Sequence, residues 1–307
     1  MLALGCALAF VSGNMHGDPL SSPAAASAPP PQPVVAVVVS KTVAGASQEH
    51  LFENSLGMRF VPVPIVSGTT KGKTILFSIW DTRVQDYDTF AKETGRMPQK
   101  ARFEQGPTHP AVWVSWRDSS DFCAWLTKEE RNKGVIGAKD EYRLPGDHEF
   151  SCAEGIGDRE DPDKSPSEKA GRISDIFPWG TAWPPPPGAG NYADDTLKKY
   201  QEQTGSNFCK AFIPNYNDGW AYTSPVGTYK PNQFGLYDMG GNVWQWCEDF
   251  WEPAHKNENH VFRGASWNCA DGNKGALSCS GRGPHGPDLR SDHIGFRCVL
   301  EVGDSSR

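Results

Sequence analysis

The stretch Phe234-Gly-Leu-Tyr-Asp-Met-Gly-Gly-Asn-Val-Trp-Gln-Trp-Cys-Glu-Asp-Phe250 decides the fold. Its two tryptophans and its aliphatic side chains offer a large surface for burial. Its three glycines permit backbone angles that are closed to other residues. An amphipathic helix would lose stability with three glycines, so we expect an ordered, loop-rich core segment. Asp238, Asn242 and Gln245 supply side-chain oxygens within the same run, which suits a segment braced by a cation.

The composition of the whole chain agrees with a loop-rich core. Its 307 residues include 32 Gly, 25 Pro and 11 Trp, and the net charge is −7. Gly and Pro punctuate turns, so we expect few long elements, and tryptophan at this density can build a core without them. The length allows one large domain plus a tail. The acidic balance and the lack of a Lys/Arg-rich run exclude a nucleic-acid surface.

The first residues differ in composition from the rest. An apolar leader or signal remnant is expected over residues 1–16, because the run Leu2–Val11 is near signal-peptide length and too short to span a bilayer. An Ala/Pro-rich linker follows over 17–49, then the domain over 50–302 and a tail over 303–307. We therefore expect export, with at most an N-terminal membrane tether. The alternative is a fragment whose apolar start belongs to something longer.

Within the domain, hydrophobic spacing predicts short elements. Strands are expected at 112–114 and 226–229, and a helix at 118–132 capped by Asp118 or Ser119. A second helix is expected over 148–153, entered through a turn at 144–147. The charged, Pro-containing stretch 158–174 is expected to be a solvated loop.

The deciding run resembles the Gly-Leu-Tyr-Asn-x-x-Gly-Asn-x-Trp-Glu-Trp signature of the formylglycine-generating enzyme (sulfatase-modifying factor) family. Further family motifs follow one another in order: 54–64, 109–116, 121–126, 142–145, 177–180, 224–227, 263–267 and 295–298. The resemblance therefore extends from about Asn54 to Leu300. It implies the family's α+β fold, with short strands, few helices and much irregular structure, related to the C-type lectin fold.

The resemblance also tests for the family's catalytic chemistry. Family enzymes hold copper(I) between two cysteines, and two soft thiolates give linear coordination. Ser266 and Cys269 fall on the active-site serine and the first cysteine, but the second cysteine falls at Lys274, whose ammonium is no ligand. Two further positions depart, at Ala270 and His293. We therefore identify a divergent member of the family and do not expect copper.

Two functions remain open. The missing cysteine favours a non-catalytic binding or scaffold module, whose ligand is a protein, a peptide or a glycan. The alternative is a formylglycine-generating-type oxidase, or another oxygen-dependent enzyme acting on a peptide cysteine or small thiol through Cys269, for which Cys209 or Cys247 would have to replace the missing ligand. Cys269 with His285 and His293 is a weaker zinc or copper candidate, because the spacing fits no metal-site pattern.

The resemblance implies two calcium sites built from oxygen ligands, as hard cations require. The first would use Asn191, Tyr192, Asp218 and Trp220. The second would use Asp238, Gly241, Val243 and Gln245, where Asp replaces the family's Asn and Gln replaces its Glu. We expect calcium to stabilise the domain. The alternative is that the two aspartates only cap turns.

The family's two disulfides have counterparts among the eight cysteines. By position the resemblance implies the pairs Cys123–Cys298 and Cys152–Cys279. The alternative is four buried free thiols, because free cysteine packs as a small apolar group.

Overall fold

The structure is a computed structural model that describes residues 38–97, 100–252, 259–270 and 274–303. The leader expected over 1–16, and all of the expected tail but its first residue, lie outside the described residues. None of the described helices is long and apolar enough to cross a membrane.

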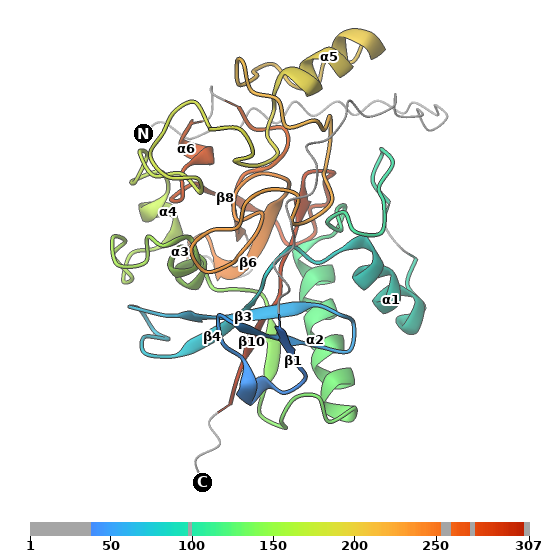
Figure 1. Ribbon diagram of the computed structural model, residues 1–307, viewed down its shortest axis with the longest axis vertical. Helices are drawn as coiled ribbons and strands as arrows, with labels where there is room; N and C mark the ends of the chain where they lie inside the picture. The colour runs from blue at the N-terminus through green and yellow to red at the C-terminus, as the bar shows by residue number, and fades with distance from the viewer. Residues whose placement is uncertain (1–37, 98–99, 253–258, 271–273, 304–307) are drawn as a thin grey trace.

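Two sheets organise the molecule (Figure 1). The larger has the order β1-β2-β3-β4-β10-β5, with β1 (Val38–Ser40), β2 (His50–Glu53), β3 (Arg59–Pro64), β4 (Thr74–Ser78), β10 (Val299–Glu301) and β5 (Glu141–Arg143). The smaller has the order β8-β7-β6-β9, with β8 (Arg282–His285), β7 (His260–Arg263), β6 (Trp244–Phe250) and β9 (Ile294–Gly295). The β1/β2 and β6/β9 pairs are parallel, and the other pairs are antiparallel.

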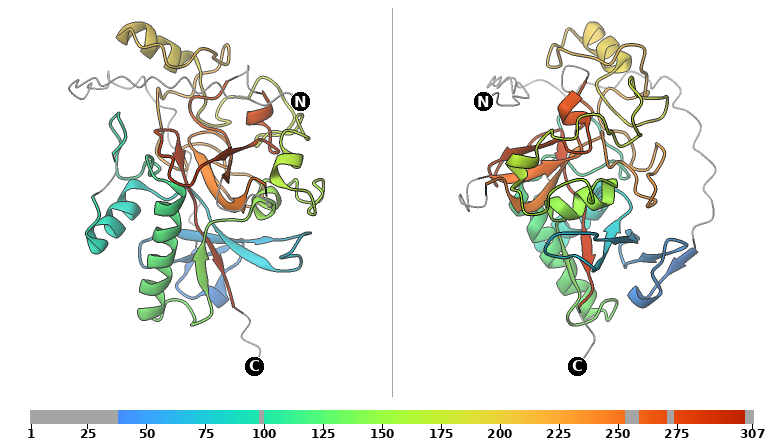
Figure 2. Two further views of the ribbon diagram at one scale, coloured as in Figure 1. Left: turned by 180° about the vertical axis from the view of Figure 1, so that it is seen from behind. Right: turned by 90° about the vertical axis from the view of Figure 1, so that its left-hand side faces the viewer.

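The helices are few and mostly short. They are η1 (Val43–Gly45), α1 (Val84–Thr94), α2 (Trp116–Asn132), α3 (Asp147–Glu154), α4 (Pro166–Lys169), α5 (Asp195–Thr204) and α6 (Lys274–Leu277). In Figures 1 and 2 the larger sheet and α2 occupy one half of the molecule, while the smaller sheet and long loops occupy the other, with α5 at its far end. This arrangement is α+β, as the sequence predicted.

Helix α2 begins earlier than expected because a different residue caps it. The side chain of Ser115 accepts a hydrogen bond from the backbone of Asp118 at 3.1 Å, and the Asp118 carboxylate accepts from the Ser115 backbone at 2.9 Å. This reciprocal capping satisfies two backbone donors at once, so Asp118 is the third helical residue rather than the cap. The predicted apolar face is present, with Phe122 and Leu126 buried.

Three other local predictions were wrong. Residues 112–114 are not a strand, because Trp113 has φ of 61°. Residues 226–229 form a turn rather than a strand, and Gly227 within this turn has a φ of 74°. Residues 38–49, expected within the linker, contain β1, which pairs with β2 at the edge of the larger sheet, followed by η1.

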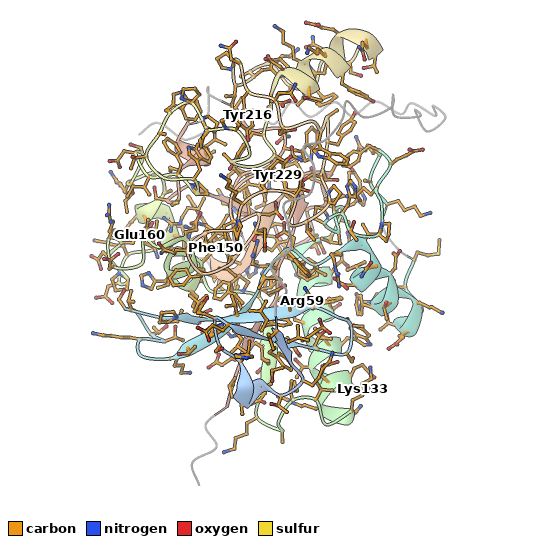
Figure 3. The ribbon with its side chains drawn as sticks, viewed as in Figure 1. Arg59, Lys133, Phe150, Glu160, Tyr216 and Tyr229 are labelled. Atoms are coloured by element: carbon orange, nitrogen blue, oxygen red, sulfur yellow. The ribbon has the colours of Figure 1, made fainter. Side chains whose placement is uncertain are left out.

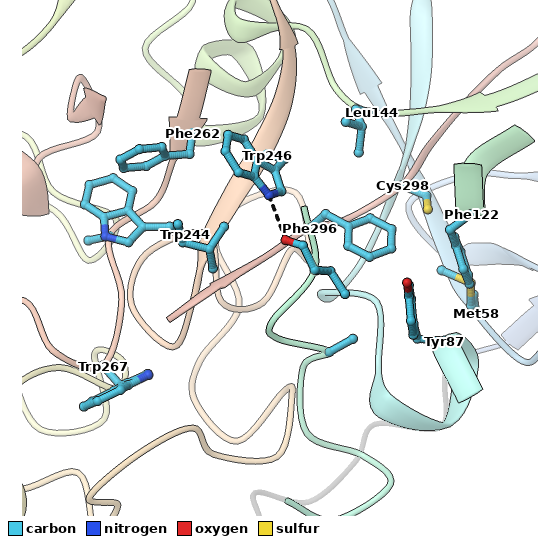
Figure 4. Close-up of a cluster of buried hydrophobic side chains, with 14 of the residues drawn as sticks. Met58, Tyr87, Phe122, Leu144, Trp244, Trp246, Phe262, Trp267, Phe296 and Cys298 are labelled. Atoms are coloured by element: carbon cyan, nitrogen blue, oxygen red, sulfur yellow. Dashed lines mark hydrogen bonds between the residues drawn. The ribbon is translucent and has the colours of Figure 1, made fainter. Parts of the chain in front are cut away.

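The core is aromatic and is anchored by the deciding run. Trp246 of β6 is fully buried, and its indole N–H donates to the carbonyl of Val114 at 3.1 Å (Figure 4). Phe296 packs edge-on against Phe122, with ring centroids 5.4 Å apart. Residues 234–243 of the deciding run are irregular, as the glycines predicted.

A network of buried charges lies where α3, α4 and the smaller sheet meet. Its members, here called the Asp147 network, are Asp147, Glu154, Glu160, Lys169, Arg263 and Arg282. Asp147 contacts Arg263 at 2.9 Å, Arg282 at 2.8 Å and Lys169 at 2.6 Å. Glu160, labelled in Figure 3, pairs with Arg282 at 2.7 Å. The stretch 158–174 is therefore not simply solvated, since Glu160 and Lys169 enter the interior.

The four cysteines of the expected disulfides are free thiols in the structure. The Cys123 and Cys298 sulfur atoms lie 3.5 Å apart, which is contact without a bond. Cys152 and Cys279 are also buried and free. Both pairings therefore stay predictions.

Candidate functional site

Three loop segments that hold the expected site residues are joined by backbone hydrogen bonds. The Asn242 N–H donates to the Asn191 carbonyl at 2.9 Å, and the Trp267 N–H donates to the Asn242 carbonyl at 3.0 Å. The Ala193 N–H donates to the Cys269 carbonyl at 2.8 Å. A Cβ at Gly241 would lie 2.5 Å from the Asn191 carbonyl oxygen, so this contact requires glycine. The expected calcium ligands and Cys269 thus share one framework.

Asn191 lies at the centre of this framework and has no exposed surface. Its amide nitrogen donates to the Tyr222 carbonyl at 2.7 Å. Its side-chain oxygen is buried without a hydrogen-bond partner. A buried acceptor without a donor is costly, and a cation would satisfy it.

Asp218 is a buried carboxylate near Asn191. It is 2% exposed and accepts hydrogen bonds from the backbones of Tyr192 and Trp220, both at 2.8 Å. Burial and the charge of Asp194 hold the pKa of Asp218 well above its ordinary value. No ion pair of the described residues includes either aspartate. Because each oxygen of a carboxylate has a second lone pair, Asp218 can still ligate a cation.

The first expected calcium set therefore fits the chemistry of a cation site: its two side chains are an orphaned amide oxygen and a carboxylate without a countercharge. Figure 3 labels two tyrosines of this region, Tyr216 and Tyr229, in the loop-rich half. The Tyr229 hydroxyl donates to the Asp218 carbonyl at 3.2 Å, and the Tyr216 hydroxyl donates to the Gly190 carbonyl at 2.6 Å. These bonds fix the segments that carry Asn191 and Asp218.

The second expected set fits less well. The Gln245 side-chain oxygen accepts from the buried Arg297 guanidinium at 2.5 Å, so a cation there would face a fixed positive charge. One Asp238 oxygen accepts from the Gly227 N–H at 2.8 Å, and the other is buried without a partner. Burial raises the pKa of Asp238 to about 6. Asp238 also lines a cavity of about 20 Å³, which is room for one water-sized particle.

The side chains of Ser266 and Cys269 are adjacent and fully enclosed. The sulfur of Cys269 lies 3.6 Å from the Ser266 oxygen, and neither residue has exposed surface. The Ser266 hydroxyl donates to the side-chain oxygen of Asn268 at 2.7 Å. The backbone of Lys274 begins α6, while its side chain lies outside what the structure describes.

The two possible replacement cysteines differ in position. The Cys209 sulfur lies 3.6 Å from the backbone carbonyl of Asn268, directly before Cys269 in the chain. Cys247 is fully buried in β6, where its sulfur faces the Gln245 carbonyl at 3.9 Å. Of these two cysteines, Cys209 is therefore the one that contacts the segment carrying Cys269.

The zinc or copper candidate built on histidines finds no support. The His293 ring is 2.8 Å from the Ser291 hydroxyl, and burial followed by the neighbouring His285 lowers the pKa of His293 to about 4. Within the part of the chain that the structure describes, no group of three or more His, Cys, Asp or Glu is arranged to hold a metal ion. That result does not bear on a site of amide and carbonyl oxygens.

Sequence reasoning missed a cluster of rings beside Ser266. The aromatic cluster consists of Phe103, Tyr200, Phe208, Tyr222 and Trp267. Phe103 stacks on Tyr222 with centroids 4.2 Å apart, and Tyr222 meets Trp267 edge-on at 5.0 Å. Phe208 is 45% exposed, so the cluster reaches the surface. No sequence spacing relates these residues, and the one local signal is that Trp267 follows Ser266.

The fold and this loop-built site define an α+β domain of the sulfatase-modifying factor type. Residues 47–302 match the model of the Sulfatase-modifying factor enzyme 1-like domain, and the chain belongs to that family.

Curated relatives include both active and inactive proteins. The chain is similar to the bovine formylglycine-generating enzyme, at 27% identity over 64% of this chain and 45% of the relative. It is also similar to the mouse inactive C-alpha-formylglycine-generating enzyme 2, at 29% identity over 63% of this chain and 50% of the relative. The chain thus spans about half the length of the curated relatives it matches.

Solved structures agree on the fold. PvdO from Pseudomonas aeruginosa has a TM-score of 0.55 at 21% identity, covering 82% of this chain and 98% of its own. CarF has a TM-score of 0.51 at 17% identity, covering 81% of this chain and 100% of its own. These likenesses support the expected sulfatase-modifying-factor fold.

Proposed function

We propose that this protein is a non-catalytic binding or scaffold module, stabilised by calcium, whose ligand is a protein, a peptide or a glycan. The observation that carries the proposal is the environment of Cys269. Its thiol has no exposed surface, so a substrate thiol would have no access to it without rearrangement. The position of the second family cysteine holds Lys274.

Ligand count gives the physical reason. Copper(I) is held by two soft thiolates, and a lone thiolate leaves it weakly bound. The inactive mouse relative is a precedent for a family member without activity. The percentage of identical residues does not distinguish an active from an inactive protein here, because the active bovine enzyme is about equally similar to this chain.

The aromatic cluster is the surface that we propose for ligand binding. Large rings bind peptides and sugars by stacking, and they lose little conformational entropy on binding. Phe208 is exposed, and it stacks on Tyr222 with centroids 5.9 Å apart. The cluster adjoins Ser266 through Trp267, so it lies beside the segment that carries Cys269.

Calcium would be held by Asn191 and Asp218 with backbone carbonyls of Tyr192 and Trp220. The orphaned oxygen of Asn191 and the uncompensated carboxylate of Asp218 support this part of the proposal. The ion would supply the missing positive charge. Since Ala193 is hydrogen-bonded to Cys269, the same ion would brace the loop beside the proposed ligand surface.

The activity assay tests the proposal directly. The protein is incubated with copper, oxygen and a Cys-x-Pro-x-Arg peptide, and the products are analysed by mass spectrometry for aldehyde. We expect no conversion above a no-protein control. Multiple turnovers would contradict the non-catalytic assignment.

One observation favours the alternative oxidase, namely the Cys209 sulfur near the Asn268 carbonyl. If turnover is found, a Cys209→Ser variant separates two explanations. Loss of turnover would assign the second thiol to Cys209, whereas unchanged turnover would require another ligand.

We also propose that the protein is exported, with at most an N-terminal tether. Fractionation of cells that produce the full chain checks this. Recovery of the protein only from the cytoplasm would contradict it.

A further inference from the structure

A cleft of about 600 Å³ opens on a part of the molecule that the proposed function does not use. Its lining includes Arg143, His148, Glu149, Glu248, Asp249 and Phe250. We call it the Arg143 cleft. It is built by β5, α3, the end of β6 and β10, and none of the aromatic cluster lines it. Its volume lies in the range of small-molecule sites.

The Arg143 cleft has an excess of negative charge. Arg143 is already engaged: its guanidinium contacts Glu149 at 2.8 Å and Glu301 at 2.9 Å. Glu248 reaches the same guanidinium only at 3.6 Å. Asp249 accepts from the backbone N–H of Asp147 at 2.5 Å and takes part in no ion pair of the described residues. Glu248 and Asp249 are both exposed residues, and the Glu248 side chain is 56% exposed. Burial of part of each carboxyl group, together with the neighbouring acidic groups, raises the pKa of both, so an added cation is favoured beside them.

His148 stands in the wall of the cleft as a neutral ring that adds no charge to it. The Ser67 hydroxyl donates to the Gly157 carbonyl at 2.9 Å, so Ser67 accepts at 2.7 Å from Nε2–H of His148. The remaining nitrogen, Nδ1, then has a lone pair, and it is buried with no partner. Burial lowers the pKa of His148, which keeps the ring neutral.

The wall chemistry points away from a metal ion. No group of three or more His, Cys, Asp or Glu among the described residues is spaced to hold one. Phe250 instead gives the cleft an aromatic wall, fixed by His260 with ring centroids 4.4 Å apart. Carboxylates beside an aromatic face are what a planar, multi-donor organic cation requires.

We propose that the Arg143 cleft binds an alkylguanidinium group, with Glu248 and Asp249 as its counter-charges and Phe250 as its stacking face. A guanidinium forms forked hydrogen bonds with carboxylates, whereas an ammonium is a compact point charge. The cleft already contains one guanidinium bound by carboxylates, because two carboxylates form ion pairs with Arg143. The group has two possible sources, an arginine side chain of a peptide or a free guanidinium compound.

Titration followed by backbone amide NMR tests the proposal on the full chain. The probes are N-acetyl-arginine amide, its neutral analogue N-acetyl-citrulline amide, the tripeptide Gly-Arg-Gly and free agmatine. We expect shifts at residues 248–250 with the guanidinium probes and at least tenfold weaker binding of citrulline. Tighter binding of Gly-Arg-Gly than of agmatine would indicate a peptide source, and the reverse a free compound.

Variants locate the binding. Glu248→Gln with Asp249→Asn should weaken binding of the arginine probe at least tenfold, since the asparagine can still accept from Asp147. The matched control is Glu93→Gln with Glu202→Gln, which removes two exposed carboxylates elsewhere. If the double variant unfolds, Glu248→Gln alone is used. The proposal would be overturned if the citrulline probe bound as tightly as the arginine probe, or if the cleft variant bound the arginine probe as tightly as the wild type. It would also be overturned if the wild type bound no guanidinium probe at ten millimolar.

Discussion

Two buried polar regions of this protein differ in how their carboxylate charges are compensated. The Asp147 network has three acidic groups and three cations in direct contact, so its charges balance when all three acids are ionised. Burial raises the pKa of Glu154 to about 8, whereas its contact with Arg263 at 2.8 Å favours the ionised form. The region around Asn191 and Asp218 has two neighbouring buried carboxylates, Asp194 and Asp218, and no ion pair of the described residues. Burying unpaired charge is costly, so the second region is incomplete by itself.

The comparison separates structural from ligand-dependent polar groups. A balanced network needs nothing from solution and fixes the packing of α3 against the smaller sheet. An unbalanced region with an orphaned amide oxygen is stable only with an added cation or with protonated carboxyl groups. Calcium dependence is therefore predicted for one region and not for the other.

The largest effect is expected from breaking the balanced network. Arg263→Met removes the guanidinium that contacts Asp147 and Glu154, leaving two buried carboxylates with less compensation. We expect a loss of about 3–5 kcal/mol in the free energy of unfolding, measured by urea denaturation. The loss should be the same with chelator and with calcium. A calcium-dependent loss would mean that the two regions are not separate.

A smaller effect concerns the pH dependence of Asp238. Burial raises its pKa to about 6 in the folded protein from an ordinary value of 3.8, so folding favours its protonated form. Its contribution to stability is present below pH 3.8 and is lost as the pH rises through 6. The Asp238→Asn variant has no carboxyl group at this position, so its stability does not show this loss. Its amide oxygen can still accept the hydrogen bond from the Gly227 N–H. Without calcium, the stability of the wild type relative to this variant should fall by about 1 kcal/mol between pH 5 and 7.

Urea denaturation of both proteins at several pH values makes that measurement. Both proteins share every other titrating group, so their difference reports Asp238 together with its effect on the neighbouring Asp81. A difference that does not change with pH would show that this carboxyl titrates as an ordinary one.

The smallest effect is expected at the surface. Arg117 pairs with Asp288 at 3.0 Å, and both side chains are mostly exposed. Arg117→Met should cost about 0.5 kcal/mol, because exposed ion pairs contribute little. The same arginine-to-methionine change thus serves as the control for Arg263. A loss as large as that of Arg263→Met would remove the distinction between buried and exposed charges.

The fold was predictable because its motifs are local and ordered along the chain. The errors have physical causes that lie outside local sequence. Trp113 reads as part of a strand but has a positive φ. Within 158–174, Glu160 and Lys169 enter the core because Arg282 and Asp147, respectively, form ion pairs with them. Asn191 and Asp218 lie in one region, since the Tyr192 N–H donates to the Asp218 carboxylate, and their role as calcium ligands stays a prediction.

The remaining features could not be predicted from sequence. The aromatic cluster and the Arg143 cleft combine residues more than 100 positions apart, such as Phe103 with Trp267 and Arg143 with Asp249. No periodicity links such residues. The orphaned oxygen of Asn191 is likewise a property of the packed state, since its neighbour Tyr222 takes only the amide nitrogen.

One measurement tests the central claim that the Asn191 and Asp218 region is completed by calcium. Thermal unfolding is recorded with a chelator, with millimolar Ca²⁺ and with millimolar Mg²⁺, for the wild type and for Asp218→Asn. An ion bound only by the folded protein stabilises it by about 2.7 kcal/mol at 100 times its Kd. The account predicts that Ca²⁺ raises the wild-type Tm by several degrees and leaves that of Asp218→Asn unchanged. Identical wild-type curves with chelator and with Ca²⁺, together with no calcium in the purified protein by elemental analysis, would contradict it.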